Sequence, residues 1–367
     1  MKISNIVFSL LFLLSGMQLS AQPERLSEDA KVSVITCGTG DELYSIFGHT
    51  AIRFSDKQQQ VDVVFNYGTF DFDTPNFYSK FIKGDLLYYL SVSDYNSFVQ
   101  HYQTDNRSVD EQILRLTNEQ KQQLWQNVLQ QFRGSEKYYT YRFIDNNCTT
   151  KVADLLNEVL PNPLETDFEE NNHTYREILN SYLTYNYFEK LGINILFGRK
   201  TDLMNEHVFM PDRLFKSIEI SQNGTDNLVQ ETQHVFTARE VTPNPLNSWW
   251  FACVLAVVFA GLSYFKAVRY LLFTISGLLG VLLVFIQLYS NHPELLNNNT
   301  VMLFNPLYLV YLFVRNRNAK KYFCYMFLAI SMLFVFLCGW NKIIIFLPLL
   351  GIYIVTLLFE NKNLKVT

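Results

Sequence analysis

Cys148 and His49 have the residue types and local settings that a thiol-imidazole pair requires. Apolar residues recur at helical spacing from 152 to 160, so Cys148 is predicted to lie at or near a helix N-terminus. At that position the helix dipole and backbone N–H groups favour the thiolate, and the pKa of a cysteine falls from about 8.5 towards about 3.5 to 7.5. The same N–H groups can hold the oxyanion formed when a thiolate attacks a carbonyl. The pattern therefore indicates chemistry at an acyl carbon.

His49 would act as the base, and the sequence around it predicts a β-hairpin. Residues 46–54 form the first predicted strand, 56–60 are turn-like, and 61–67 return as the partner strand. Asn66 on the second strand could lie beside His49 and fix the tautomer of its ring. An asparagine that only completes a turn is the alternative reading.

Other alternating segments predict further strands around this hairpin. They are residues 31–36, 86–92, 109–116 and 138–144. Ser93 or Asp94 would cap a short helix between two of them, and Thr117 with Gln120 forms a capping-box pattern for a longer helix. The fold class predicted for this part of the chain is α+β.

The composition of the chain changes sharply along its 367 residues. With 34 acidic and 30 basic side chains there is no strong net charge, so we expect no nucleic-acid partner. Up to about residue 241 the sequence is mixed and polar, whereas residues 249–359 are overwhelmingly apolar. The two parts are therefore predicted to lie in different solvents.

The apolar part predicts a membrane domain of five helices. The candidate spans are residues 249–265, 269–289, 301–314, 323–340 and 343–359. Lysine and arginine side chains cluster between the first two spans, between the third and fourth, and in the tail, so these segments should be cytoplasmic. The loop at 290–300 and everything before the first span should then be extracytoplasmic.

The N-terminus has the layout of a signal peptide. Lys2 precedes an apolar run at 6–14, and Ser20-Ala21 offers a cleavage site, with an uncleaved anchor as the alternative. We therefore predict a signal peptide at 1–21 and a catalytic domain at 22–165. An amphipathic helical collar or lid follows at 166–245, and the membrane domain spans 246–367.

Five cysteines occur in the sequence, and only Cys37 and Cys148 fall in the exported part. Cys253, Cys324 and Cys338 lie in predicted spans and are interpreted as small apolar packing residues. A disulfide between Cys37 and Cys148 is an alternative in an oxidising compartment.

The order of a strand-borne histidine followed by Asn-Cys at a strand-to-helix junction resembles the circularly permuted branch of the NlpC/P60 papain-like superfamily. Several segments resemble more closely the Lnb family, the lipoprotein N-acyltransferases of Bacteroides-type bacteria. They are CGTGDELYS at 37–45, FGHTAIR at 47–53, NYG at 66–68, FIKG at 81–84 and DNNCTT at 145–150. The apolar half, with His292-Pro293 and Asn305-Pro306, is also similar to that family.

This resemblance implies transfer of a fatty acyl chain from a phospholipid, through a thioester on Cys148, to the α-amine of a diacylglyceryl-cysteine lipoprotein. It implies a bacterial inner-membrane protein with a periplasmic catalytic domain and a cytoplasmic C-terminus, and no metal or cofactor. The third catalytic position stays open, because Asn66, Asp71 and Asp145 all fit.

Four residues are candidates for substrate binding: Arg53, Tyr67, Asn147 and His292. Arg53 could pair with a phosphate or be an ordinary surface charge. Asn147 is also typical of a helix cap. His292 could contact a lipid headgroup or only bridge the backbone of its loop.

Two other classes of function compete with acyl transfer. An exported cysteine hydrolase, either a peptidoglycan peptidase or a phospholipase, would use the same pair, although a multispan membrane half is unusual for a peptidase. A non-enzymatic membrane binding protein would be expected to carry ionisable residues along a path through its spans, and the predicted spans contain almost none.

Overall fold

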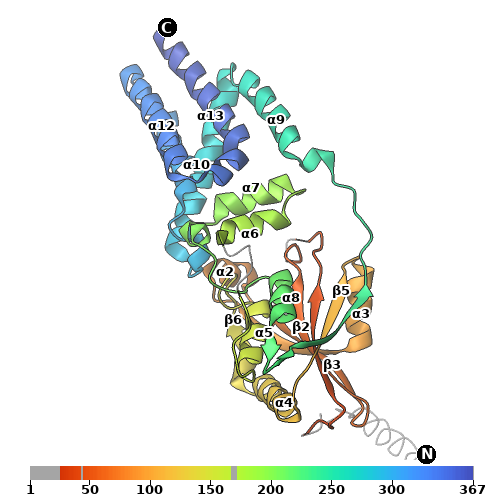
Figure 1. The fold of residues 1–367 in the computed structure, drawn as a ribbon. Helices are drawn as coiled ribbons and strands as arrows, with labels where there is room; N and C mark the ends of the chain where they lie inside the picture. Colours follow the sequence, from red (N-terminus) through yellow and green to blue (C-terminus); the bar gives the residue numbers. More distant parts are fainter. Residues whose placement is uncertain (1–24, 43, 167–171, 367) are drawn as a thin grey trace, which may run out of the picture.

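A computed structural model describes residues 25–42, 44–166 and 172–366 of the chain (Figure 1). The predicted signal peptide at 1–21 lies outside the described residues. An α+β domain with an antiparallel sheet forms one end of the molecule, and a helical membrane domain forms the other (Figure 1).

The sheet has seven strands in the order β6-β4-β3-β2-β1-β5-β9. The bounds are β1 Lys31–Cys37, β2 His49–Asp56, β3 Val61–Thr69, β4 Leu87–Asp94, β5 Val109–Leu114, β6 Tyr138–Thr140 and β9 Val229–Phe236. The predicted hairpin is confirmed, because β2 and β3 pair antiparallel with Ile52 opposite Phe65. The strand expected at 138–144 ends at Thr140, since Arg142 and Asn146 close a tight turn through mutual backbone hydrogen bonds.

The strand β9 was not predicted, and it pairs with β5 at the edge of the sheet. Its sequence VQETQHVF is largely solvent-exposed and alternates only weakly, so local periodicity gave no signal. A second hairpin of two short strands, β7 (Gln222–Asn223) and β8 (Asp226–Asn227), precedes it.

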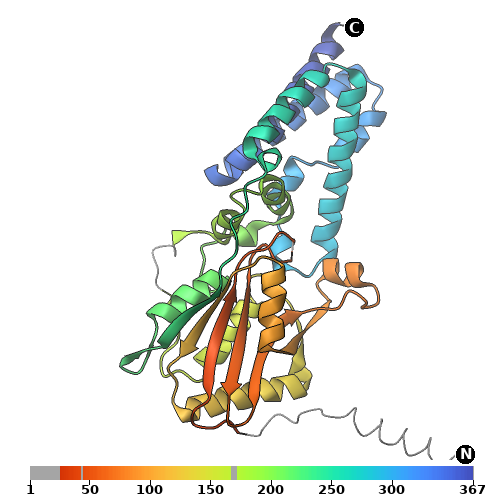
Figure 2. The same cartoon turned by 90° about the vertical axis from the view of Figure 1, so that its right-hand side faces the viewer.

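Helices cover both faces of the sheet. One face packs against α4 (Asn118–Arg133), α5 (Cys148–Asn157) and α8 (Pro211–Ile220), with Trp125 fully buried in this core. The other face packs against α3 (Tyr95–Thr104), which lies in front of the sheet in Figure 2. The predicted capping box of Thr117 and Gln120 on α4 is present, and Asp94 caps α3.

Three helical segments lie between the sheet and the membrane domain. They are α6 (Tyr175–Tyr182), α7 (Tyr187–Leu196) and the turn η3 (Arg199–Asp202) (Figure 1). Tyr187 on α7 donates a hydrogen bond to the Ile345 carbonyl of the membrane domain, with an O···O distance of 2.8 Å. This region therefore connects the two ends of the molecule, whereas α8 and β9, which fall within the predicted collar segment 166–245, pack with the sheet. The domain boundaries remain a prediction.

The membrane domain contains α9 (Trp249–Leu262), α10 (Lys266–Tyr289), α11 (Leu307–Phe313), α12 (Arg317–Leu337) and α13 (Trp340–Val366). Among the described residues, α10, α12 and α13 are the three helices long and apolar enough to cross a membrane. The predicted third span at 301–314 is not one continuous α-helix: it starts in the 3-10 turn η6 (Asn299–Met302), and α11 begins only at Leu307, after Pro306. The first predicted span likewise ends early, at Leu262.

A buried ion pair holds α10 to α13, and it joins the first residue of the second predicted span to the residue that follows the fifth. Arg269 Nε donates to Glu360 Oε2 at 2.5 Å, and Tyr311 donates to Glu360 Oε1 at 2.6 Å. Because the two charges are 91 positions apart in the sequence, periodicity could not pair them.

Candidate active site

Cys148 is the first residue of α5, and Asn147 caps the helix as the sequence predicted. Asn147 Oδ1 accepts hydrogen bonds from the backbone N–H groups of Thr149 at 2.8 Å and Thr150 at 3.0 Å. Its Nδ2 donates to the carbonyls of Phe143 and Phe209. The Asn147 side chain is thus buried and used to fix the start of α5, and its predicted contact with substrate stays a prediction.

His49 is the first residue of β2, at the end of the sheet that faces α6. Its Nε2 lies 3.3 Å from Asn66 Oδ1, which confirms the predicted proximity of the two side chains. The amide of Asn66 donates to the Val64 carbonyl and to Ser93 Oγ, so its oxygen is the acceptor for His49. Nε2 therefore carries the proton, and Nδ1 is the nitrogen available to the thiol.

The surroundings of Cys148 favour its thiolate. Burial opposes ionisation, but the charge of His49 and a hydrogen bond from its side chain outweigh it, and the pKa of the Cys148 thiol is lowered. The backbone N–H of Thr50 and the hydroxyl of Thr149 add hydrogen bonds that lower the pKa further. Thr50 Oγ1 and Thr149 Oγ1 lie 3.1 Å apart, so β2 and α5 are joined at the site.

Cys37 lies opposite His49 in the register of β1 and β2, and both cysteines are free thiols. Burial raises the pKa of the Cys37 thiol well above its ordinary value, against the smaller opposing effects of Arg107 and of a hydrogen bond to Tyr102. The disulfide alternative is absent from this structure. The ring of Tyr102 stacks on His49 with centroids 6.4 Å apart. Tyr102 and Cys37 therefore both lie next to the histidine.

The pairing of β3 with β4 is irregular next to the thiol. The register of β3 and β4 shifts between Asn66 and Thr69, and Gly68 adopts a φ of 89°. A Cβ at Gly68 would lie 3.7 Å from Cys148 Cβ and 3.4 Å from the Tyr141 ring. Glycine is favoured here by the positive φ, since the contacts that a Cβ would make with Tyr141 and Cys148 are ordinary van der Waals contacts.

Two tyrosines near the thiol, Tyr139 and Tyr141, were missed by the sequence analysis. Tyr141 stacks on Tyr88 at 4.5 Å, and burial raises the pKa of Tyr88 to about 12. Burial also raises the pKa of Tyr139, and a negative charge on Cys148 raises it further. Aromatic residues in strand-like segments resemble ordinary core residues, so their alternation gave no sign of a site.

Two predicted substrate-binding residues have other partners in the structure. Arg53 forms ion pairs with Asp62 at 2.7 Å and Glu111 at 3.0 Å, and its guanidinium lies 3.3 Å from the centre of the Tyr95 ring. Tyr67 is 1% exposed and donates to Gln131 on α4 at 2.6 Å. Arg53 is thus held within the sheet, and Tyr67 lies in the core rather than at a surface that a substrate could reach.

The loop that carries His292 packs against the sheet domain. His292 Nε2 donates to the Phe81 carbonyl at 2.9 Å, so the ring bridges backbone as the second reading of this residue proposed. The guanidinium of Arg142 lies beside it, since a Cβ at Gly84 would be 2.8 Å from Arg142 Nη1 and 3.2 Å from His292 Nε2. Nearby, Glu294 Oε1 accepts from the Ile144 N–H at 3.1 Å. Arg142 is a further residue that sequence reasoning missed.

The structure separates the three candidates for the third catalytic position. Asn66 is bonded to His49, whereas Asp145 forms an ion pair with Lys200. Asp71 is exposed and accepts from the N–H of Asp73 at 2.9 Å. Asn66 is therefore the candidate that contacts the imidazole.

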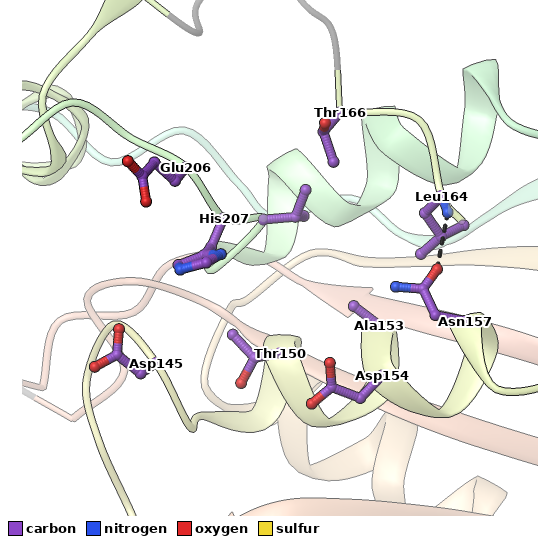
Figure 3. A pocket seen from close by; sticks show the side chains of 10 residues that line it. Asp145, Thr150, Ala153, Asp154, Asn157, Leu164, Thr166, Glu206 and His207 are labelled. Atoms are coloured by element: carbon purple, nitrogen blue, oxygen red, sulfur yellow. Dashed lines mark hydrogen bonds between the residues drawn. The ribbon is translucent and has the colours of Figure 1, made fainter. Parts of the chain in front are cut away.

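A cavity of about 280 Å³ opens on the flank of α5 (Figure 3). Its polar lining includes three carboxylates, Asp145, Asp154 and Glu206, together with His207, Thr150, Asn157 and Thr166. Burial raises the pKa of Asp154. None of His49, Asn66 and Cys148 lines this cavity, so it is separate from the thiol site.

Among the described residues, no group of three or more His, Cys, Asp or Glu side chains is arranged to hold a metal ion.

Comparison with known families covers both ends of the chain. Residues 22–181 match the family model described as the Lnb N-terminal periplasmic domain, and residues 235–362 match the one described as the Lnb transmembrane domain. No curated protein and no solved structure shows a significant match to the chain.

Proposed function

Because the chain belongs to the Lnb family of lipoprotein N-acyltransferases, we propose that it acylates the α-amine of diacylglyceryl-cysteine lipoproteins through a thioester on Cys148. The observation that carries this proposal is the joint placement of Cys148 at the start of α5 and of His49 against Asn66. In a membrane protein with a periplasmic domain, phospholipid is an abundant acyl donor.

The first half-reaction would load the thiol. The Cys148 thiolate attacks the ester carbonyl of a phospholipid, and the Cys148 backbone N–H, which the Asn147 cap does not use, can donate to the oxyanion. The ester C–O bond then breaks, and the leaving alkoxide takes a proton from His49 Nδ1 to depart as a lysophospholipid. Asn66 holds the imidazole through Nε2 during this transfer.

The second half-reaction would transfer the acyl group from Cys148 to the lipoprotein. The neutral α-amine of the lipoprotein attacks the thioester carbonyl, and His49 accepts a proton from the amine as the new C–N bond forms. The C–S bond breaks and Cys148 leaves as the thiolate that its surroundings favour. The products are an amide on the lipoprotein and the starting form of the site.

The remaining parts of the proposal concern the setting of this site. The sheet domain would be a circularly permuted papain-like fold in the periplasm, because His49 precedes Cys148. The chain would be an inner-membrane protein that crosses the bilayer five times after removal of a signal peptide at 1–21, with its C-terminus in the cytoplasm. His292 and its neighbour Arg142 would contact the phospholipid headgroup, since a guanidinium is well suited to bind phosphate.

The test is capture of the intermediate. With phospholipid supplied and acceptor withheld, intact mass spectrometry should show full-length protein heavier by one acyl group, on Cys148, and neutral hydroxylamine should remove it. A diacylglyceryl-cysteine peptide should discharge the adduct and gain an N-acyl group, whereas a peptide with a blocked amine should not. Discharge mainly to free fatty acid in the presence of the competent peptide would show a phospholipase instead. An adduct that persists in Cys148→Ala would overturn the assignment of the nucleophile.

A further inference from the structure

Five aromatic side chains form a continuous surface on one segment of the sheet domain. This aromatic strip consists of Phe70, Phe72, Phe77, Tyr78 and Phe81, whose neighbouring rings have centroids 4.9 to 6.2 Å apart. Three of these side chains belong to the helix α2 (Phe77–Lys83), which has no buried residue. Phe72 is 62% exposed and Tyr78 is 75% exposed. Several large rings gathered on an exposed surface mark a site of interaction.

One end of the aromatic strip is joined to the membrane domain. Ser79 and Tyr289, the last residue of α10, share a hydrogen bond of 3.1 Å. The N–H of Asn291 donates to the Lys83 carbonyl at 2.8 Å. The helix α2 therefore lies beside the sheet-facing end of a membrane-length helix (Figure 2). That level corresponds to the membrane-water interface, where aromatic side chains are favoured.

The other end of the strip leads to the thiol. The ring of Phe70 lies 5.4 Å from that of Tyr88, and Tyr88 stacks on Tyr141 at 4.5 Å. Tyr141 and Cys148 both border Gly68, where a Cβ would be within 3.4 and 3.7 Å of them. A chain of neighbouring aromatic rings thus extends from α2, which is bonded to the end of α10, to Tyr141, which borders Gly68 together with Cys148.

We propose that the aromatic strip is the binding surface for phospholipid acyl chains, and that it guides one ester from the periplasmic leaflet to Cys148. Its continuity with α10 favours lipid over the polypeptide of a lipoprotein as the occupant. An apolar chain of a lipid can lie along consecutive rings while its headgroup stays at the interface. The role of the strip in guiding the ester to Cys148 rests on the proposed function, but the binding of lipid to the strip does not.

Binding is tested directly by photo-crosslinking in the full-length protein. Cys148→Ala protein in vesicles would receive a phosphatidylethanolamine with a diazirine in one acyl chain, and peptides carrying adducts would be identified by mass spectrometry. Adducts are expected at residues 70–82, and they should fall in the Phe72→Ala/Tyr78→Ala double variant. Adducts confined to the membrane helices would overturn the proposal. So would labelling of the strip by a lipoprotein peptide with its diazirine in the polypeptide.

Delivery is tested by the acylation kinetics of the double variant with two donors. Loss of the contacts of two largely exposed rings should raise KM for long-chain phospholipid by about tenfold or more. The rate with p-nitrophenyl acetate, which is too short to use the strip, should change much less. Tyr138→Ala on β6 is the matched control, because this ring is 55% exposed and lies outside the strip.

The outcomes separate the two proposals. If the double variant forms the Cys148 thioester from phospholipid with wild-type KM, the strip has no role in delivery while the proposed function stands. If the wild type forms no thioester but the strip is crosslinked by lipid, the proposed function fails and the lipid-binding surface stands. An equal loss with both donors would show damage to the thiol site and would overturn the delivery role.

Discussion

Cys37 and Cys148 are two buried thiols near His49, and their environments affect the thiol pKa in opposite directions. Cys37 ends a strand and is surrounded by core side chains of the α3 face. Cys148 begins a helix and receives hydrogen bonds from His49 and from the Thr50 N–H. Burial is shared, so the difference comes from the element that carries each thiol and from the donors that meet it.

The largest expected difference between the two cysteines is in acyl transfer. Cys148→Ser should lower transfer by at least about a thousandfold, because a neutral hydroxyl is a much weaker nucleophile than a thiolate. Cys37→Ala should remain within about threefold of wild type and lose about 1 kcal/mol of stability for the small cavity. The measurement is N-acylation of a diacylglyceryl-cysteine peptide by purified full-length protein in vesicles. Comparable loss in both variants at equal folded yield would contradict the comparison.

The next effect concerns the histidine that both thiols border. His49→Ala should lower transfer by about a hundredfold to ten-thousandfold, the usual contribution of a general base. Asn66→Ala should cost less, about tenfold, because the ring keeps its Tyr102 contact but loses its tautomer partner. Single-turnover rates of Cys148 acylation would measure both. A larger loss in Asn66→Ala than in His49→Ala would exclude the proposed roles.

Alkylation across pH would measure the difference in pKa itself. The lowered pKa of Cys148 means that its thiolate persists below the ordinary thiol pKa of about 8.5, and its reaction with iodoacetamide should decline only as pH falls through that lowered value. The raised pKa of Cys37 predicts no reaction until strongly alkaline pH. Peptide mapping of the two sites after short pulses separates them from the membrane cysteines. Equal midpoints for both sites would refute the comparison.

Local periodicity was sufficient to predict the parts of the site that depend on one element or one hairpin. The helix that starts at Cys148 and the hairpin that places Asn66 against His49 both follow from alternating or helical spacing within short segments. Capping residues just before the helical segments also predicted the starts of α3 and α4.

Features that depend on contacts between distant segments could not be predicted in this way. The edge strand β9 is defined by its pairing with β5, more than a hundred positions earlier. Arg142 and Tyr141 enter the site because a tight turn replaces the expected end of β6 and because the His292 loop packs on it. The ion pair of Arg53 with Glu111 likewise joins two strands far apart in the sequence and could not be predicted, and the role of Arg53 in substrate binding stays a prediction.

The smallest expected effect isolates the contribution of the helix start. Asn147→Ala removes the acceptor of the Thr149 and Thr150 N–H groups, and loss of such a cap costs about 1 kcal/mol, with more added for its two buried donor contacts. Thr117→Ala removes the equivalent cap of α4, far from the thiol, and is the matched control. Both variants should unfold at lower denaturant concentration.

Only Asn147→Ala should also slow alkylation of Cys148 at neutral pH, since the first turn of α5 would then hold the thiolate less well. Its alkylation midpoint should shift towards that of an ordinary cysteine, while the midpoint in Thr117→Ala stays at the wild-type value. If both variants lost the same stability and neither changed the midpoint, then His49 and the Thr50 N–H alone would account for the thiolate. The position of Cys148 at a helix start would in that case serve only to place the sulfur.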